Sequence, residues 1–490
     1  MHAHGIQALA LGVIVSLASP AQAFWRMPCP ATLVQERADP IIEPGEVSAH
    51  VHAIMGGDGF GFNMTYDQAR ASTCSSCPIS ADMSNYWVPT LYYHAQNGSF
   101  LSVKNIGSTV YYEQRPGNAT EKLHAFPEGF RMIAGDPFKR NYTGDFAAQA
   151  VSYVCLDYSG GAPGQTTGFQ QQNCADGLRA QLYFPSCWDG VNLDTPDHKS
   201  HMAYPIQIYN GGYCPSTHPV HMISLFYETI WQINDFADGW YDGTTPPFVL
   251  STGDPTGYGY HGDFVNGWDV SVLQNAVDNC NDPNGIMENC EYFTLTTDAS
   301  ANCMIEPSVD EQVFGVLDAL PGCNPVQNGP EPATQQTGCG ATMTISAPST
   351  NSVDLSSIGW EYVGCATDNV NARTLTGYTS STDNMTVEGC VEECSAKGYT
   401  FAGLEYADQC YCGDSVASAD MPVKGVIGNC QMACSGNSAE YCGGGSALSL
   451  YQKTGANSTT TAATTTATPS RKRSTHRRRR HANHFLDSSS

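Results

Sequence analysis

YWVPTLYY, residues 86–93, is the stretch of the sequence that most clearly indicates the fold class. Its aromatic and β-branched residues, interrupted by one proline, are typical of short buried strands that end at turns. Segments of the same kind, rich in Tyr, Trp, Phe, Gly and Pro, continue from residue 24 to about residue 339. Helical periodicity is scarce and is clearest in residues 270–277 and 309–320. We therefore predict a mainly β N-terminal domain, sandwich-like or jelly-roll-like, held together by disulfides.

The length and charge of the chain limit its organisation and its partners. With 490 residues it is too long for one ordinary domain, so we expect two domains with flexible ends. Only 14% of the residues are charged, and Asp and Glu outnumber Lys and Arg by 47 to 22. Such a body does not attract a phosphate backbone, and we expect no nucleic-acid partner.

The N-terminus has the pattern of a secretory signal. An apolar run at residues 6–17 precedes Ala21-Gln22-Ala23, whose small residues at alternate positions fit a signal peptidase site. We predict a signal peptide at residues 1–23 and no transmembrane segment, because no later stretch offers about 20 consecutive apolar residues. Six glycosylation sequons follow, at Asn63, Asn97, Asn118, Asn141, Asn384 and Asn457. These features predict a secreted glycoprotein, extracellular or in the cell wall.

The cysteines divide into two sets. Of the 20 cysteines, 12 lie between Cys29 and Cys339 and eight between Cys365 and Cys442. An exported chain passes through an oxidising compartment, so disulfides are favoured over thiols or metal ligands. Because both sets are even, each domain can pair its own cysteines, although the sequence leaves the pairing open.

Composition places the domain boundaries. We predict an N-terminal domain at residues 24–345, a linker at 346–358, a second domain at 359–453 and a tail at 454–490. The tail is Thr-rich and then basic, a composition that cannot bury enough apolar surface to fold. Its basic end, residues 471–480, admits three interpretations: a dibasic processing site, an arm attracted to anionic wall polymers or to the body, or a solvated segment without function.

The second domain is small and rich in cysteine. Disulfides substitute for buried apolar area in such a domain. Cys390 and Cys394 are four residues apart, so they face the same side of a helix and can attach it to strands. The full set is Cys365, Cys390, Cys394, Cys410, Cys412, Cys430, Cys434 and Cys442.

Four motifs of this domain, VGC at 363–365, YTFAGL at 399–404, QCYCG at 409–413 and YCGG at 441–444, resemble the WSC domain. The resemblance implies a small disulfide-rich α+β fold that binds carbohydrate, typically a fungal wall glucan. Aromatic rings stack on sugar C–H faces, and polar side chains pair with hydroxyls. Our candidates for sugar contacts are Tyr406, Asp408, Gln409 and Tyr411. The alternative is that the aromatic residues fill the small core.

The N-terminal domain also resembles a known family. FWRMPC at 24–29, SAHVH at 48–52, SHMAYP at 200–205, CPSTHP at 214–219 and GYGYHGDF at 257–264 are similar to a domain of unknown function in fungal secreted proteins. That domain frequently precedes WSC modules. The resemblance implies a domain boundary and no mechanism.

Histidine spacing suggests a metal site. His50 and His52 would point to one face of a strand, a spacing at which two imidazoles can ligate one ion. His201, His221 or His261 could supply a third ligand. Imidazoles favour zinc or copper and do not favour calcium. The metal ligands that we predict are His50, His52, His201 and His221.

A second chemistry needs no metal. His261 with Asp263, or Asp254 with Glu228, could act as general acid and base on a glycosidic bond. The alternative is that the histidines bond to backbone carbonyls or pack against aromatic rings without a function in binding or catalysis.

Taken together, we expect a secreted, wall-associated protein that binds wall polysaccharide, a β-glucan, through its WSC domain. Its N-terminal domain would bind or modify polysaccharide. The alternative is a polysaccharide-active enzyme, dependent on zinc or copper or on carboxylates, whose WSC domain raises the local substrate concentration. A redox copper protein ranks third. Serine-nucleophile elbows, phosphate loops and dinucleotide fingerprints are not evident.

Overall fold

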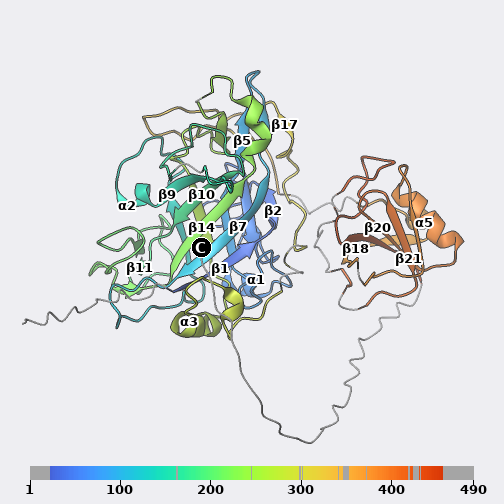
Figure 1. Cartoon of the computed structure of the whole chain (residues 1–490), viewed down its shortest axis with the longest axis horizontal. Coiled ribbons are helices and arrows are strands. Elements are labelled where there is room, and N and C mark those ends of the chain that lie inside the picture. The colour runs from blue at the N-terminus through green and yellow to red at the C-terminus, as the bar shows by residue number, and fades with distance from the viewer. Residues whose placement is uncertain are drawn as a thin grey trace, which may run out of the picture.

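The structure is a computed structural model of the whole chain, with two bodies (Figure 1). It describes residues 23–455 apart from residues 162–163, 244, 297–299, 301, 340–341, 346–351, 371, 418–419, 423–429 and 431. The predicted signal peptide up to residue 22, the predicted tail from residue 456 and half of the predicted linker lie outside the described residues.

A five-stranded antiparallel sheet forms one layer of the N-terminal domain. Its strand order is β1-β7-β14-β10-β9. In that order the strands are β1 (Phe24–Cys29), β7 (Asn105–Glu113), β14 (Ser224–Trp231), β10 (Leu178–Tyr183) and β9 (Val151–Cys155). The sequence order of the strands differs from their spatial order, so this sheet joins segments that lie far apart in the chain.

A second five-stranded antiparallel sheet forms the other layer, with the order β2-β3-β4-β16-β8. Its strands are β2 (Val34–Glu36), β3 (His52–Gly56), β4 (Asn85–Pro89), β16 (His261–Val265) and β8 (Arg131–Gly135). β3 and β16 both run antiparallel to the central β4, so they run in the same direction and begin at the same end of the sheet.

The two sheets pack face to face. The Tyr86 ring of β4 contacts the Tyr227 ring of β14 at a centroid distance of 5.7 Å. The Tyr227 hydroxyl donates to the backbone carbonyl of Asp263 at 3.0 Å. Met55 and Phe264 join the same buried cluster. The prediction of a mainly β, sandwich-like and disulfide-bonded domain is confirmed.

The outer face of the second sheet is buried as well. Ile54, Trp87 and Val265 belong to a separate apolar cluster with Phe60, from a segment that covers this face. Trp87 meets the Phe60 ring edge-on, with centroids 5.7 Å apart. Every residue of β3, β4 and β16 is buried, so alternate side chains of these strands enter two different compartments.

Smaller elements surround the sandwich. One sheet has the order β15-β5-β6-β17 and another β12-β11-β13. These strands are β15 (Phe248–Leu250), β5 (Leu91–His94), β6 (Phe100–Ser102), β17 (Val316–Leu317), β12 (Met202–Ala203), β11 (Cys187–Trp188) and β13 (Val220–His221). The helices are α1 (Tyr66–Arg70), α2 (Phe146–Gln149), α3 (Val270–Asn279), η1 (Ile233–Gly239), η2 (Met287–Asn289) and η3 (Ser356–Ile358).

One of the two helical expectations is confirmed and the other is wrong. Helix α3 covers the predicted residues 270–277. Residues 309–320 form no helix and contain strand β17 instead. Val309, Val313 and Leu317 are all buried at a helix-like spacing, but an extended segment brings each of them to an apolar surface.

Every cysteine forms a disulfide within its own domain, as the two even sets predict. The N-terminal pairs are Cys29–Cys77, Cys74–Cys303, Cys155–Cys174, Cys187–Cys214, Cys280–Cys290 and Cys323–Cys339. The pair Cys74–Cys303 spans 229 residues, so it joins the two ends of the domain.

The C-terminal domain is a five-stranded antiparallel sheet with one helix. The strand order is β18-β22-β20-β21-β19. The elements are β18 (Trp360–Thr367), β19 (Tyr378–Ser381), α5 (Val387–Ala396), β20 (Phe401–Glu405), β21 (Gln409–Gly413) and β22 (Ala447–Lys453). Helix α5 is attached to β21 by two disulfides, and the pairs are Cys365–Cys430, Cys390–Cys410, Cys394–Cys412 and Cys434–Cys442. The predicted disulfide-rich α+β fold is confirmed.

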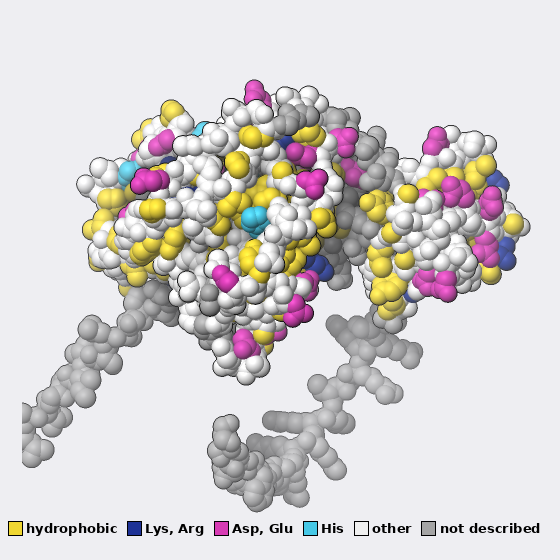
Figure 2. Space-filling model, turned by 90° about the horizontal axis from the view of Figure 1, so that it is seen from above, with side chains coloured by type: hydrophobic (Ala, Val, Ile, Leu, Met, Phe, Trp, Pro, Cys, Tyr) yellow, Lys and Arg dark blue, Asp and Glu magenta, His cyan; other side chains and the backbone are white. Residues whose placement is uncertain are grey.

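Acidic side chains are spread over the face of the molecule in Figure 2, where few Lys or Arg side chains are visible. This distribution agrees with the excess of acids over bases in the sequence. Among the described residues, no helix has both the length and the apolar character needed to cross a membrane.

A chain of buried hydrogen bonds crosses the core of the sandwich. The Trp268 indole donates to the Tyr112 hydroxyl at 2.7 Å, which lies 2.8 Å from the Tyr86 hydroxyl. Tyr86 donates in turn to the Asp82 carboxylate, which also accepts the Ser84 backbone N–H at 3.0 Å. Burial nevertheless raises the pKa of Asp82 from 3.8 to about 6.

This shift predicts a pH dependence of stability. The unfolded chain ionises at Asp82 before the folded protein does, so stability falls as the pH rises from about 4 to about 6. In Asp82→Asn this contribution disappears. We expect the unfolding free energy of the variant to gain about 2 kcal/mol relative to wild type between pH 4 and pH 7, measured by urea denaturation with disulfides intact. The exposed Asp67→Asn is the control, and a difference independent of pH would contradict the prediction.

Candidate functional site

Strand register brings two histidines to the same end of the second sheet. His52 begins β3 and pairs with Pro89 of β4, and His261 begins β16 on the other side of β4. Asp263 pairs with Trp87. His261 is two residues before Asp263, and Pro89 is two residues after Trp87. In an antiparallel pair His261 and Pro89 therefore lie level with each other. Alternation along the strands then sends His52, His261 and Asp263 to the outer face of the sheet.

His50 completes a cluster of three imidazoles. Its ring centroid is 4.3 Å from that of His52 and 5.0 Å from that of His261. The Nε2 atoms of His50 and His261 are 3.0 Å apart. Each of the three rings has a nitrogen within 4.8 Å of a nitrogen of the others, a separation that one metal ion could bridge.

Backbone carbonyls orient two of the rings. His52 Nδ1 lies 3.0 Å from the carbonyl of Ala38, and His261 Nδ1 lies 2.9 Å from the carbonyl of Gly259. A carbonyl only accepts hydrogen bonds, so both Nδ1 atoms carry the proton and both Nε2 atoms keep a lone pair. His52 Nε2 is buried and has no hydrogen-bond partner among the described residues. This arrangement is typical of metal-binding histidines.

The environment keeps these imidazoles neutral. Burial lowers the pKa of His52 and of His261 to about 3. Burial, followed by the proximity of the other two rings, holds the pKa of His50 well below its usual value. Neutral imidazole is the form that coordinates metal ions.

Two buried carboxylates lie beside the imidazoles. Asp39 and Asp263 each place an oxygen within 4.8 Å of a His52 nitrogen. Asp39 accepts the backbone N–H groups of Ile41 and Ile42 at 3.0 and 3.1 Å. Asp263 Oδ2 is buried without a hydrogen-bond partner among the described residues. Burial and then repulsion from Asp39 raise the pKa of Asp263 well above its usual value.

A cavity of about 310 Å³ opens onto His50, His261 and Asp263. Its lining includes one lysine, Lys199, and five carboxylates: Asp39, Glu43, Asp136, Asp197 and Asp263. Residues 323–336 form part of one wall. The excess of negative charge favours a cation in this cavity.

The predicted catalytic residue Asp254 holds a wall of the cavity together. Its carboxylate lies 3.5 Å from the Arg140 guanidinium, and both side chains are fully buried. Arg140 also donates to the carbonyls of Pro137, Thr252 and Gln327 at 2.8, 3.2 and 2.9 Å. The pair therefore connects residues 323–336 to two other segments of the cavity wall.

The structure does not bring Asp254 and Glu228 into contact. Glu228 lies on β14 of the other sheet and is 8% exposed. It accepts hydrogen bonds from Tyr111 and Gln181 at 2.7 and 2.8 Å, and Arg179 lies 3.2 Å away. Glu228 does not line the cavity that His50 and His261 line.

Two of the predicted metal ligands lie elsewhere. His201 uses both ring nitrogens, with the Arg131 carbonyl at 2.8 Å and the Thr195 hydroxyl at 3.0 Å. His221 is only 2% exposed. It lies 3.2 Å from Glu121 and 3.4 Å from the hydroxyl of Ser186. These contacts give both histidines a structural environment apart from the cluster at His52.

Sequence reasoning missed Asp39. It follows strand β2 in a loop whose backbone N–H groups it accepts, which resembles an ordinary turn residue in sequence. Only the tertiary structure places it behind His52. His261, by contrast, stands in the sequence as a possible third ligand, and it is the one of the three candidates that the structure places beside His50 and His52.

The four predicted sugar-contact residues of the C-terminal domain separate into two kinds. Tyr406 lies in the turn between β20 and β21, is 58% exposed and has a φ of 52°. Asp408, in the same turn, accepts the Ser381 hydroxyl at 3.1 Å. Tyr411 is buried under the Arg373 guanidinium and donates to Gln409 at 2.8 Å. The turn is accessible to a ligand, and Tyr411 packs in the core.

A β sandwich with a histidine cluster, joined to a small disulfide-bonded α+β module, defines the class of protein. Residues 39–268 match the model of the domain of unknown function DUF1996, and residues 362–444 match that of the WSC domain. The chain carries a DUF1996 domain followed by a WSC domain, as the two resemblances predict.

Several known proteins share one segment of the chain. A WSC domain-containing protein of Arthroderma benhamiae is 42% identical over 103 residues, which are 20% of this chain and 11% of that protein. Xylosyltransferase oxt of Drosophila melanogaster is 38% identical over 95 residues, 18% of this chain and 10% of that protein. Kremen protein 2 of Mus musculus is 32% identical over 92 residues, 19% of this chain and 20% of that protein.

The chain thus spans a fifth or less of the length of each of these three relatives. The match to the WSC domain model and the similarity to a protein named as WSC domain-containing show that this chain contains a WSC domain. Disulfide-rich domains are consistent with secretion.

The Arg140–Asp254 pair gives a test of what Asp254 does. Asp254→Asn leaves a buried guanidinium without its counter-ion, so we expect a loss of about 3–5 kcal/mol in unfolding free energy, measured by chemical denaturation. The exposed Asp238→Asn is the matched control and should lie within about 0.5 kcal/mol of wild type. Unchanged stability in the first variant would contradict a structural role for this pair.

Proposed function

We propose that this protein binds a wall β-glucan through its WSC domain and acts on the bound polysaccharide at a zinc or copper centre in its DUF1996 domain. The observation that carries the proposal is the convergence of His50, His52 and His261 beside a buried carboxylate, Asp263, whose Oδ2 has no hydrogen-bond partner among the described residues.

Electrostatics supports a cation at this site. Burying a charged carboxylate without a partner is costly, and Asp39 and Asp263 share one buried region. The three imidazoles are neutral and cannot compensate them. A divalent ion coordinated by the imidazoles and by Asp263 would balance the carboxylates and satisfy His52 Nε2. Nitrogen ligands with one carboxylate suit zinc or copper.

The protein residues have distinct parts in this proposal. The carbonyls of Ala38 and Gly259 fix the tautomers of His52 and His261, so that each ring keeps a lone pair on Nε2. His50 lies at the cavity, where substrate has access. A bound ion would supply Lewis-acid chemistry and lower the pKa of a bound water. Asp263 is positioned as a ligand or as an acceptor for a proton at its free Oδ2.

A metal-free glycosidase is less well supported. Retaining glycosidases hold their two carboxyl groups about 5–5.5 Å apart, and inverting enzymes hold them about 6.5–9.5 Å apart. Oxygens of Asp39 and Asp263 lie within 4.8 Å of each other and on the same side as His52. This short separation favours a shared cation over attack from two faces of a sugar.

The WSC domain would act by concentrating the substrate. Tyr406 and Asp408 present an exposed ring and a carboxylate in one turn, the combination that recognises sugar faces and hydroxyls. Attachment to an insoluble polysaccharide raises the local substrate concentration around the larger domain.

Metal analysis tests the centre. We expect the purified mature protein to hold one equivalent of zinc or copper after dialysis, measured by plasma mass spectrometry. His50→Ala, His52→Ala and Asp263→Asn should each lower metal affinity more than tenfold, since each removes a ligand. His218→Ala, at a half-buried histidine outside the cluster, is the control and should retain the metal. Circular dichroism checks that the variants fold, and a folded wild type without metal would overturn the proposal.

Co-sedimentation with insoluble β-glucan tests the binding turn. Tyr406→Ala removes a stacking ring, which is worth about 1 kcal/mol, so we expect the apparent affinity to fall about fivefold to tenfold. Tyr158→Ala removes a 79% exposed tyrosine from the larger domain and should not change binding. Equal affinities of the two variants would argue against sugar contact at Tyr406.

A further inference from the structure

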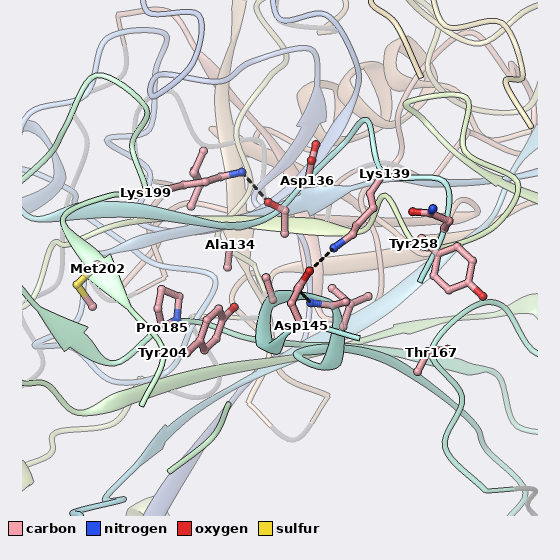
Figure 3. A pocket seen from close by; sticks show the side chains of 16 residues that line it. Ala134, Asp136, Lys139, Asp145, Thr167, Pro185, Lys199, Met202, Tyr204 and Tyr258 are labelled. Carbon is pink, nitrogen blue, oxygen red and sulfur yellow. Dashed lines mark hydrogen bonds and ion pairs between the residues drawn. The ribbon is translucent and has the colours of Figure 1, made fainter. Parts of the chain in front are cut away.

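A second cavity adjoins the one that holds the histidines. It has a volume of about 350 Å³, and its lining is seen in Figure 3. Residues 133–136 and Lys199 line both cavities. The two hollows therefore lie on either side of the end of β8, and a ligand longer than one cavity could occupy both.

The shape between the cavities depends on Gly135. Its φ is +81°, and a Cβ there would come 2.4 Å from the backbone oxygen of Tyr260. Lys199 Nζ donates to the Gly135 carbonyl at 2.7 Å. Only glycine fits this left-handed bend close to a neighbouring strand, so the boundary between the two cavities is a built feature of the chain.

The second cavity has a balanced charge, unlike the first. Its lining contains two lysines and two aspartates: Lys139, Lys199, Asp136 and Asp145. Lys139 lies 3.7 Å from Asp145, and Lys199 is held by a backbone carbonyl. Because the charges offset one another locally, this cavity favours a neutral polar ligand over an anion or a metal ion.

Aromatic and polar groups alternate along this cavity. Figure 3 shows Tyr204 and Tyr258 at opposite ends, with the Lys139–Asp145 pair between them. The Tyr204 hydroxyl donates to the Tyr183 carbonyl at 2.9 Å, which fixes its ring. Met202 adds apolar surface at the same end as Tyr204. Rigid rings combined with hydrogen-bonding side chains match the two faces of a sugar unit.

We propose that the second cavity is a glycan subsite, which binds a neutral sugar unit of the same polysaccharide chain whose neighbouring units reach the histidine cluster. This inference rests on the proposed polysaccharide substrate and does not depend on the metal. The subsite would set the position and direction of the chain across the end of β8, with Tyr258 as the stacking ring and the Lys139–Asp145 pair as the hydroxyl contacts.

A photoaffinity experiment tests the subsite in the full mature chain. A β-glucan hexasaccharide that carries a diazirine is irradiated with the protein, and mass spectrometry locates the label. We expect labelled peptides from residues 139–148 and 251–260, in addition to peptides of the WSC domain. Tyr258→Ala should reduce cavity labelling at least fivefold and leave WSC labelling unchanged, because it removes only the local stacking ring.

Three comparisons make the result decisive. Tyr158→Ala is the matched control and should keep full labelling. His52→Ala removes the proposed metal centre and should also keep it, so loss of metal and loss of the subsite are separate outcomes. Asn141 lines the cavity and belongs to a sequon, so Asn141→Gln is labelled in parallel. Label confined to the WSC domain, or seen in the cavity only with Asn141→Gln, would overturn the proposal.

Discussion

Burial of both faces of the β2-β3-β4-β16-β8 sheet is the constraint on which the candidate site depends. Strands in such a sheet send alternate side chains into two separate compartments. The inner positions of β3 and β16 fill the sandwich. Their outer positions carry His52 and His261 at one end, Ile54 and Asp263 level with Trp87, and Val265 towards the other end. Polar groups placed there have little access to water.

The end of strand β8 lies between two cavities whose linings differ in charge. On one side, carboxylates outnumber the single lysine and neutral imidazoles converge, which suits a cation. On the other side, Lys139 and Asp145 offset each other between two tyrosine rings, which suits a neutral sugar. The buried ion pair of Arg140 and Asp254 supports the wall of the first of these cavities. Charge thus distinguishes two adjoining cavities that share residues 133–136 and Lys199.

Part of the candidate site could be read from the sequence. The His-x-His spacing predicts two neighbouring rings on a strand, and the rings of His50 and His52 are neighbours, although β3 begins at His52 and His50 lies in a bend before it. The same reasoning could not choose among His201, His221 and His261, because strand order and register are not local properties. No sequence pattern indicated that Asp39 belongs to the candidate site. Asp254 and Glu228 have the residue type of catalytic acids, yet their contacts are those of buried structural networks.

The sequence by itself determined the β-rich class of the larger domain and the two family resemblances. It also indicated that each domain pairs its own cysteines, but not which cysteines pair. These follow from local composition, spacing and even cysteine counts, which do not depend on how distant segments meet. Residues 309–320 form no helix although their apolar spacing predicts one, because that spacing reflects contacts with other segments. Local patterns cannot reveal such contacts. Only the tertiary structure decided which histidines converge, because β4 must lie between β3 and β16 before His52 and His261 can meet.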